Sequence, residues 1–589
     1  MSLREALSAA VGDAFEAEGL PRNLGAVQTA DRPDLAQFQC NGAMPAAKIA
    51  KRKPRDIAEG VAARLRAHAD FASVEPAGPG FLNITLADAA LETALKAAVA
   101  DPKLGGWTKP EERIILDYGG PNVAKPLHVG HLRAAIIGES LKRLFRFVGD
   151  EVIGDIHLGD WGLPMGMLIA DLKRTQPALP YFSDDKPDGP FPDVSPVSLS
   201  DLEEMYPRAA AACKADPDRM EEARRATAEL HAGHAGYRAL WKGFLAVSRE
   251  AIEREYGDLG VSFDLWKGES DVDDLIDPMQ SELRAAGVAE ESDGALIIKV
   301  AQEGDAKETP PLILLKSDGS ALYGTTDLAT ILDRRRAYDP KRILYVVDQR
   351  QSLHFEQVFR AAERAGYFDG DRLEHIGFGT MNGPDGKPFK TREGGVLKLR
   401  DLIDMVRGRA ADRMAEAGVA EGYGAEETAA IAHHVGVAAL KFADLSNVRT
   451  SNYVFDLDRF VSFEGKTGPY LQYACVRLRS VLRKAAAERG ETPDASRLQV
   501  ESDAVRALVL AALRWPDVIA AAYAKRTPHL LCDFLFDLAQ AVSGFYAVHK
   551  IVGEPDADLR ASRLALADFA ARLLAEGLFL LGIEAPDRM

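Results

Sequence analysis

The sequence from residue 113 to residue 147 joins a short apolar run, a loop rich in glycine and proline, and a segment with helical periodicity. Ile114, Ile115 and Leu116 are typical of a parallel strand that is buried on both faces. After Gly130, apolar residues recur at helical spacing: Leu132, Ile136, Ile137, Leu141, Leu144 and Phe145. This order predicts an open α/β sheet, in which ligands bind beyond a strand's carboxyl end and at a helix amino terminus.

Two histidines stand where this helix begins. His128 and His131 are three residues apart and therefore face the same way. Neutral imidazoles in this place can donate hydrogen bonds to phosphate oxygens while negative charge builds up on them. Gly130 lets a ligand press against the backbone. A histidine pair that binds metal or only packs is the alternative, and the strand–loop–helix context favours the nucleotide site.

The length of 589 residues predicts three or four domains with sizeable cores. The four cysteines are scattered, with no CxxC pair, which indicates a reducing compartment and no disulfide framework. We find no signal peptide, and no apolar run approaches the length of about 18 residues that a membrane span needs. These features predict a cytoplasmic protein without a membrane partner.

The net charge of -17 is unusual for a protein that binds nucleic acid, because phosphate contacts require lysine and arginine. The charge is uneven: residues 466–526 carry eleven Lys and Arg against six Asp and Glu, a net +5 that leaves -22 for the rest. Residues 48–55 form a second basic run. Either patch can attract a polyanion locally, and a solvated charged surface is the alternative for each.

The rest of the chain predicts a modular order. Residues 1–105 favour a small α/β domain, and residues 106–424 a Rossmann-like doubly wound parallel sheet. The second strand is expected at 151–155, followed by an insertion at about 171–300. Further strands of the same sheet are expected at 312–315 and 343–347, and one ending near 377–379. Residues 425–589 favour an all-α helical bundle.

Polar residues follow two of the later strands. Tyr323 and Asp327 lie at a predicted strand–turn–helix, where Thr325 or Thr326 would cap the helix and Asp327 would occupy its first turn. Gln351 and His354 surround the next strand-to-helix turn, where we expect Ser352 to be the cap. Two successive strands that are each followed by polar residues at their carboxyl ends suggest one site. A capping role alone is the alternative for Asp327.

The motifs resemble those of a known family. Pro-Asn-x-x-Lys-Pro-x-His-x-Gly-His-Leu-Arg at 121–133 is similar to the HIGH signature of class I aminoacyl-tRNA synthetases, in the long form typical of arginyl-tRNA synthetases. The same family is resembled by Gln39–Met44, by the Gly-Asp-Trp-Gly loop at 159–162, by Tyr323-x-Thr-x-Asp327 with Gln351-x-x-His354, and by the Pro-x-Arg-Met ending. The resemblance covers nearly the whole length.

This resemblance implies roles for individual residues. Tyr323, Asp327 and Gln351 would line the pocket for the arginine side chain, Asp117 would reach the substrate, and Asn122 would contact its backbone end. A carboxylate and an amide oxygen can accept the planar donors of a guanidinium in a fixed geometry. The signature residues His128, Gly130 and His131 would bind ATP, and the two histidines would act in catalysis.

A glycine-rich basic loop at 381–395 occupies the place of the family's KMSKS loop but departs from it. Its cations, Lys387, Lys390 and Arg392, can close over ATP phosphates and stabilise departing pyrophosphate. Some arginyl enzymes also lack the usual lysines, and the lysine before their HIGH motif is thought to compensate. Lys125 matches that position. A solvated turn is the alternative for the loop.

The resemblance implies an arginine–tRNA ligase that uses ATP with Mg²⁺ and has no permanently bound cofactor or protein metal site. Its partners would be L-arginine and tRNA(Arg), which the first domain would touch at the elbow and the helical domain at the anticodon. We expect a monomer. We expect Tyr470 and Tyr473 in the helical core, and His231 and His234 on a solvated helix face. Another class I HxGH enzyme and a non-catalytic tRNA-binding relative are the alternatives.

Overall fold

The computed structural model describes residues 2–32, 34–183, 189–317, 320–383, 385–387, 397–419 and 422–589. The chain forms two compact units, which we describe separately. The first comprises residues 1–109, 413–442 and 461–589, and the second comprises residues 110–412 and 443–460.

A parallel sheet of four strands forms the centre of the second unit. Its order is β11-β10-β5-β6, so the first strand in sequence is internal and the chain winds outward from it in both directions. This arrangement confirms the predicted doubly wound core. The strands are β5 (Arg113–Tyr118), β6 (Glu151–Asp155), β10 (Arg342–Val346) and β11 (Leu373–His375).

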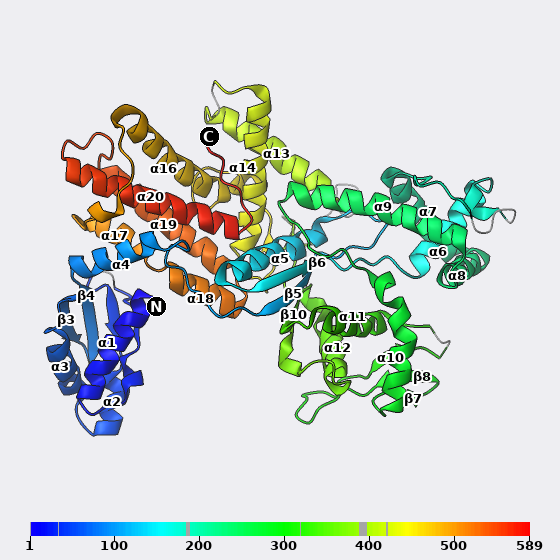
Figure 1. Ribbon diagram of the computed structural model, residues 1–589, viewed down its shortest axis with the longest axis horizontal. Helices are drawn as coiled ribbons and strands as arrows, with labels where there is room; N and C mark the ends of the chain where they lie inside the picture. Colours follow the sequence, from blue (N-terminus) through cyan, green and yellow to red (C-terminus); the bar gives the residue numbers. More distant parts are fainter. Residues whose placement is uncertain are drawn as a thin grey trace. The chain divides into compact units, whose positions relative to one another are not determined.

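Helices cover both faces of this sheet (Figure 1). The signature helix α5 (Val129–Val148) lies on one side and buries the apolar residues predicted for it. The helices α11 (Tyr323–Tyr338) and α12 (Ser352–Arg364) lie on the other side, where Ile115 of β5 joins a core with Leu328 and Val358. The residues of β5 from Ile114 to Tyr118 are therefore buried, as a doubly covered strand requires.

Three local predictions are wrong. The strand β9 (Leu312–Leu315) belongs to a separate antiparallel sheet with β7 (Glu290–Ser292) and β8 (Ala295–Ile298), because a short apolar run does not specify its partners. The strand β11 ends at His375, so Phe378 makes only an isolated bridge. The helix α11 begins at Tyr323, which places Thr325 and Thr326 inside it rather than at its cap, and Asp327 beyond its first turn.

The predicted insertion is mainly helical. Trp161, in the loop after β6, stacks on His231 with 4.5 Å between ring centroids, and its indole donates to Asp273. His231 is exposed, as predicted, but it also packs on this loop. The helices are α6 (Leu163–Thr175), α7 (Leu199–Ala215), α8 (Pro217–His231), α9 (Ala235–Asp258) and α10 (Asp273–Ala285).

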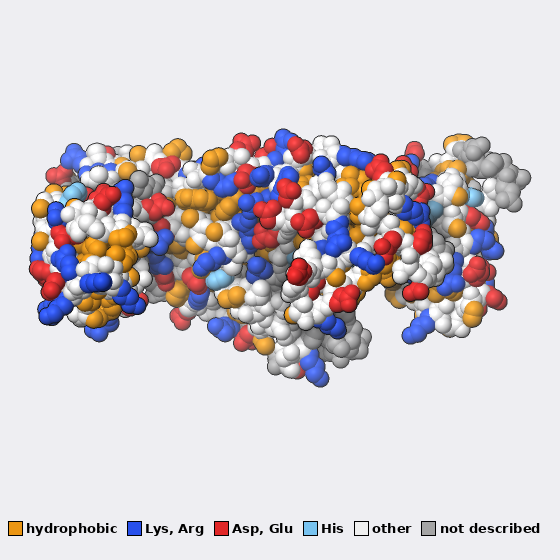
Figure 2. All heavy atoms as spheres, turned by 90° about the horizontal axis from the view of Figure 1, so that it is seen from below, with side chains coloured by type: hydrophobic (Ala, Val, Ile, Leu, Met, Phe, Trp, Pro, Cys, Tyr) orange, Lys and Arg blue, Asp and Glu red, His pale blue; other side chains and the backbone are white. Residues whose placement is uncertain are grey.

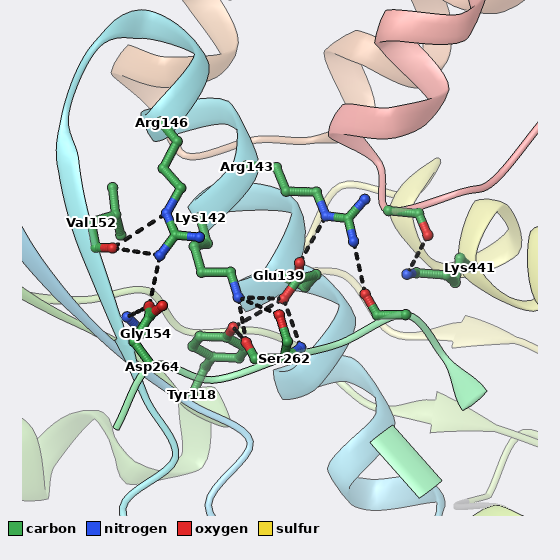
Figure 3. A network of polar contacts seen from close by, with 12 residues as sticks. Tyr118, Glu139, Lys142, Arg143, Arg146, Val152, Gly154, Ser262, Asp264 and Lys441 are labelled. Atoms are coloured by element: carbon green, nitrogen blue, oxygen red, sulfur yellow. Dashed lines mark hydrogen bonds and ion pairs between the residues drawn. The ribbon is translucent and has the colours of Figure 1, made fainter. Parts of the chain in front are cut away.

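A buried polar network ties α5 to the segment after α9 (Figure 3). The Glu139 carboxylate accepts hydrogen bonds from Lys142 and Arg143 of its own helix, at 2.8 and 2.7 Å. It also accepts from the Tyr118 hydroxyl of β5 and from the backbone N–H of Ser262. Since almost all of its bonding capacity is used, Glu139 fixes α5 relative to β5.

The remaining elements of the second unit lie in the basic loop or follow it. The first two residues of the loop form β12 (Met381–Asn382), which pairs in parallel with β13 (Tyr453–Val454). After the loop come α13 (Leu399–Glu416) and α14 (Ala425–Leu445), each of which crosses between the two units in sequence, and then α15 (Leu457–Phe460).

The first unit begins with the predicted small α/β domain. Its antiparallel sheet has the order β1-β2-β4-β3, and β4 alternates between buried and half-buried residues as its sequence predicts. Lys48, Lys53 and Arg55 of the basic run are exposed. The elements are α1 (Leu3–Ala17), β1 (Val27–Thr29), β2 (Phe38–Cys40), α2 (Ala43–Ala50), α3 (Pro54–Leu65), β3 (Phe71–Ala77), β4 (Phe81–Leu86) and α4 (Asp88–Ala100).

The carboxyl-terminal helices form the predicted bundle. The expectation that Tyr473 lies in its core is wrong, since this side chain is 43% exposed. Together with Tyr470, Arg477 and Tyr546 it lines a cavity of about 80 Å³ between two helices. The helices are α16 (Gly468–Arg489), α17 (Asp503–Ala512), α18 (Trp515–Lys525), α19 (His529–Val548) and α20 (Ala557–Leu580).

Two stretches of this bundle, 503–525 and 529–548, are long and apolar enough to cross a membrane on length and composition alone. The first is interrupted between α17 and α18, and α19 buries its apolar face within the bundle. We therefore assign both stretches to the bundle core. All four cysteines, Cys40, Cys213, Cys475 and Cys532, are buried thiols outside any disulfide bond.

Candidate active site

The loops that follow β5 and β6 are joined through their backbones. Val123 N–H donates to the Gly159 carbonyl at 2.9 Å, and Gly159 N–H donates to the Pro121 carbonyl at 3.0 Å. A Cβ at Gly159 would lie 2.5 Å from the Asn122 amide oxygen, so a larger residue there would displace the Asn122 side chain. The predicted substrate residue Asn122 is therefore held in a fixed loop with its side chain exposed.

The two histidines cap the amino terminus of α5 reciprocally. His128 Nδ1 accepts from Gly130 N–H at 3.0 Å, and His131 Nδ1 accepts from His128 N–H at 3.1 Å. The two rings stack with 3.9 Å between centroids. Because both Nδ1 atoms are acceptors, the proton of each neutral ring sits on Nε2. This arrangement leaves two Nε2–H donors for a ligand.

Electrostatics keep both rings neutral. Burial lowers the pKa of His131 to about 3. Burial also lowers the pKa of His128, and the nearby Lys125 ammonium lowers it further. Lys125 itself lies over the Tyr206 ring of α7, with 4.4 Å from Nζ to the centroid. Positive charge beside the site thus resides on Lys125, while the imidazoles act as neutral donors.

The residues that follow the basic loop reach the signature residues. Lys398 forms an isolated bridge with His128, and Val129 N–H donates to the Leu397 carbonyl at 3.1 Å. Lys387 lies at the near end of the loop, in a turn closed by Gly383, and it is exposed. The other two predicted cations, Lys390 and Arg392, lie outside the described residues.

Asp327, Tyr323 and His354 form one cluster. Asp327 Oδ2 and His354 Nε2 are 2.6 Å apart, and the Tyr323 and His354 rings lie 4.7 Å apart between centroids. The prediction that Ser352 caps α12 is wrong, since Ser352 is the first residue of the helix and Gln351 is its N-cap. Gln351 is exposed, about one turn before His354. The structure therefore brings Asp327 to the same helix start that carries Gln351.

Asp117 lies in a buried environment, unlike the exposed Asn122 and Gln351. Its carboxylate accepts from Arg334 at 2.6 Å, and Arg334 also donates to Asp155 at 2.7 Å. Asp117 and Asp155 are register partners on β5 and β6. Burial raises the pKa of the Asp117 carboxyl, and Arg334 opposes that rise. Asp117 thus reaches the site as part of an ion network.

Two site residues were missed by sequence reasoning, Glu269 and Arg334. Burial, reinforced by the nearby Asp160 and Asp327, raises the pKa of the Glu269 carboxyl to about 7. Glu269 follows no strand or loop motif, so the sequence gives no signal for it. Arg334 does have a signal, because it lies seven residues after Asp327 and therefore on the same face of α11.

The strands that lead to these residues end at one edge of the sheet. The strand β10 pairs in parallel with β5, with Tyr345 opposite Asp117. The helix α5 follows β5, and α12 follows β10, so both helix starts lie at the carboxyl ends of neighbouring strands. The chain order reverses between these strands, which is the place where open α/β sheets bind ligands.

Three family models match successive parts of the chain. They are described as "Arginyl tRNA synthetase N terminal domain" (residues 1–86), "tRNA synthetases class I (R), catalytic domain" (94–457) and "DALR anticodon binding domain" (471–589). The arginine–tRNA ligase of Hyphomonas neptunium is 54% identical over the full length of both chains. The chain belongs to the arginyl-tRNA synthetase family. The resemblance inferred from the motifs is confirmed.

Other members of the arginyl-tRNA synthetase family agree. The arginine–tRNA ligase of Maricaulis maris is 52% identical over the full length of both chains. The structure of the Thermus thermophilus arginyl-tRNA synthetase matches all of both chains with a TM-score of 0.78 at 24% identity. That of the Plasmodium falciparum enzyme matches with a TM-score of 0.79 at 22% identity, covering 100% of this chain and 99% of the other. The predicted fold class is therefore confirmed along the chain.

Proposed function

We propose that the chain activates L-arginine with ATP and transfers it to the 3′ end of tRNA(Arg). The observation that carries this proposal is the pair of neutral histidines, whose Nε2–H groups have no acceptor among the described residues, next to an acidic cluster at the adjoining strand end. The histidines suit a phosphate and the acids suit a guanidinium. Family membership supports the same reaction.

In the first step the arginine carboxylate attacks the α-phosphorus of ATP in line. A bond forms between a carboxylate oxygen and phosphorus, and the bond to the bridging oxygen breaks as pyrophosphate leaves. No protein group needs to bond covalently, so catalysis consists of positioning and charge stabilisation. We assign the two Nε2–H donors of His128 and His131, with the ammonium of Lys125, to the oxygens that gain charge.

The phosphates extend toward the basic loop in this proposal. Lys387, Lys390 and Arg392 would neutralise the departing pyrophosphate, and Gly130 would allow the nucleotide close to the backbone. The bridge between Lys398 and His128 supports this placement, because Lys398 follows the loop by three residues and lies beside the signature. Mg²⁺ would enter with ATP, coordinated largely by phosphate oxygens and water.

We assign the acidic cluster to the amino acid. Asp327 and Gln351 would accept the guanidinium donors beside Tyr323, and Asp117 with Asn122 would bind the α-ammonium end. Only one Asp327 oxygen carries the contact to His354, so the other can turn to the substrate. We add Glu269, since a guanidinium beside its carboxyl would favour the ionised form.

For tRNA, we propose that residues 1–105 touch the elbow, 106–424 hold the catalytic site, and 425–589 read the anticodon. The cavity lined by Tyr470, Tyr473, Arg477 and Tyr546 supports the last assignment. Arg477 lies 3.8 Å from the Tyr546 centroid, and such aromatic–guanidinium surfaces stack unpaired bases. We also propose that the enzyme works as a monomer in the cytoplasm.

Exchange of pyrophosphate into ATP, measured in the presence of tRNA across the amino acids, tests this function. We expect exchange with arginine alone. A response to lysine or cysteine instead would indicate another class I enzyme. The His128→Ala variant tests catalysis against mere tRNA binding: kcat should fall by about 10²- to 10³-fold with the tRNA Kd unchanged. Charging at the parental rate would remove the histidine from the mechanism.

A further inference from the structure

Arg334 is a fully buried cation beneath the amino-acid end of the site. Its side chain is 0% exposed, and it donates to Asp117 and Asp155 from one side of α11. Within the described residues, its Nε and Nη1 atoms have no hydrogen-bond acceptor. Its guanidinium lies 5.5 Å from the centroid of the Tyr345 ring. The triad therefore carries a net charge of about -1 inside the protein.

Stability alone does not account for such a triad. Removing three charges from water is costly, and apolar side chains of similar volume are often at least as stabilising. A buried guanidinium with incomplete hydrogen bonding adds to that cost. The arrangement is better explained by something that it does for the site.

The two carboxylates of the triad are not equivalent. Asp155 is 0% exposed, whereas the Asp117 side chain remains 12% exposed. Arg334 contacts Oδ2 of Asp117, and within the described residues no hydrogen bond is made by Oδ1. Asp155 contacts Arg334 through Oδ2 and accepts from the His157 N–H at Oδ1, at 3.4 Å, while Asp117 connects the cation with the substrate side.

We propose that Arg334 is a positioning residue, which holds the Asp117 carboxylate ionised and aimed so that its open oxygen receives the α-ammonium group of the amino acid. Asp155 keeps Arg334 in place from the other side. This inference rests on the proposed role of Asp117 in binding the substrate. It assigns a task to two residues that need not touch the substrate themselves.

The charges around Asp117 determine how the arrangement responds to pH. The groups that face Asp117 are Arg334 of α11, Asp155 of β6, His157 in the loop after β6, and Tyr345 of β10. Burial raises the pKa of Asp117, Asp155 raises it further, and Arg334 and His157 lower it. Loss of the guanidinium must therefore raise this pKa, and loss of the Asp155 charge must lower it.

The test uses the full-length enzyme with tRNA and measures KM for arginine and kcat between pH 6 and pH 9. In Arg334→Met, KM should rise by roughly 30-fold or more at pH 7, the usual cost of removing one partner of a buried charge pair. In this variant KM for arginine should fall part of the way back toward the parental value as the pH rises, because Asp117 then ionises. KM for ATP should stay within about twofold. Arg334→Lys should lie between parent and Met, since an ammonium lacks the guanidinium fork.

Two further variants keep the test decisive if Arg334→Met does not fold. Asp155→Asn should move the acid limb of arginine binding to lower pH, opposite in direction to the Met and Lys variants. Arg336→Gln, an exposed change on the same helix, is the control and should behave as the parent. The inference would be overturned if the Arg334 and Asp155 variants moved the acid limb of arginine binding in the same direction. It would also be overturned if none of these variants moved it.

Asp117→Asn separates this inference from the proposed function. If Asp117→Asn leaves KM for arginine unchanged, the assignment of Asp117 fails and the role of Arg334 fails with it. If Asp117→Asn raises KM but the Arg334 and Asp155 variants do not move the pH profile, only the positioning role is overturned.

Discussion

The two histidines at the start of α5 differ in how strongly burial affects them. His131 has a pKa of about 3 in the folded chain and about 6.5 when unfolded. Between these values the unfolded state binds the extra proton, so the free energy of unfolding falls as the pH falls below about 6.5. Above that pH the contribution is complete.

We therefore predict that His131→Asn flattens this pH dependence. Between pH 7.5 and pH 5.5 the parent should lose up to about 1.4 kcal/mol more stability than the variant, because each unit of pH below the unfolded pKa corresponds to about 1.4 kcal/mol. Urea unfolding of both proteins at the two pH values measures the difference. Parallel behaviour of the two proteins would mean that His131 is not buried as neutral imidazole.

Asp327 supplies a prediction about specificity. Its side chain is only 24% exposed and contacts His354. Asp327→Ala should lower kcat/KM for arginine by roughly 30-fold to several thousandfold, because a guanidinium would lose a partly desolvated partner. ATP affinity, measured by equilibrium binding, should remain. The Asp327→Asn variant keeps the shape, so an equal loss there would show that charge is what matters, and parental activity in both would remove Asp327 from the pocket.

Single residues also show where sequence reasoning stops. The residue pairs His128–His131 and Asp327–Gln351 were predicted because strands and helix starts leave local patterns. The proton positions on the histidines, the contact between His354 and Asp327, and the buried Glu269 depend on residues distant in sequence. No local pattern specifies them. Arg334 would also be interpreted as part of an exposed basic run, although its spacing from Asp327 argues otherwise.

Among the elements, α5 depends on one glycine for its packing. A Cβ at Gly138 would lie 2.2 Å from Cγ of Tyr118 on β5, so helix and strand approach there as closely as a glycine allows. The predicted elements β5, α5, β6 and β10 follow from apolar runs and periodicity. Which sheet β9 joins does not follow, because four apolar residues fit either.

We predict that Gly138→Ala destabilises the second unit by about 1–3 kcal/mol, through overpacking of Tyr118. The matched control is Gly408→Ala on α13, where a Cβ meets nothing within 4 Å. That change should stabilise by about 0.4–1 kcal/mol, because it lowers the entropy of the unfolded chain. Thermal unfolding of the two variants compares them directly. Equal shifts would show that α5 can move away from β5.

For the whole molecule, the net charge of -17 is the main feature that opposes binding of tRNA, because tRNA is also negatively charged. On the face shown in Figure 2, lysine and arginine side chains are interspersed with acidic ones. Several cations of the basic region at 466–526 also form ion pairs with acidic residues of the chain, including Arg497 with Asp558 and Arg506 with Asp88. The exposed basic run of the first domain is therefore the better candidate for phosphate contacts.

We predict that tRNA affinity falls steeply with salt and that this run contributes. In a variant with Lys48, Lys53 and Arg55 changed to glutamine, the slope of log K against log salt should become less steep by about 0.9 for each cation that contacts a phosphate of duplex geometry. Filter binding between 50 and 200 mM salt, which are about the limits over which this effect is large, measures it. A parental slope would exclude the run, and a flat response of the parent would refute phosphate steering altogether.

The four buried thiols have a practical consequence. Cys40 lies on β2, Cys213 on α7, Cys475 on α16 and Cys532 on α19, so each occupies a different element. A water-soluble alkylating reagent can reach each sulfur only during a transient opening of its own surroundings. Mass spectrometry of the modified peptides would then rank the four regions by how often each one opens transiently. The native cysteines serve as the probes, so none has to be introduced.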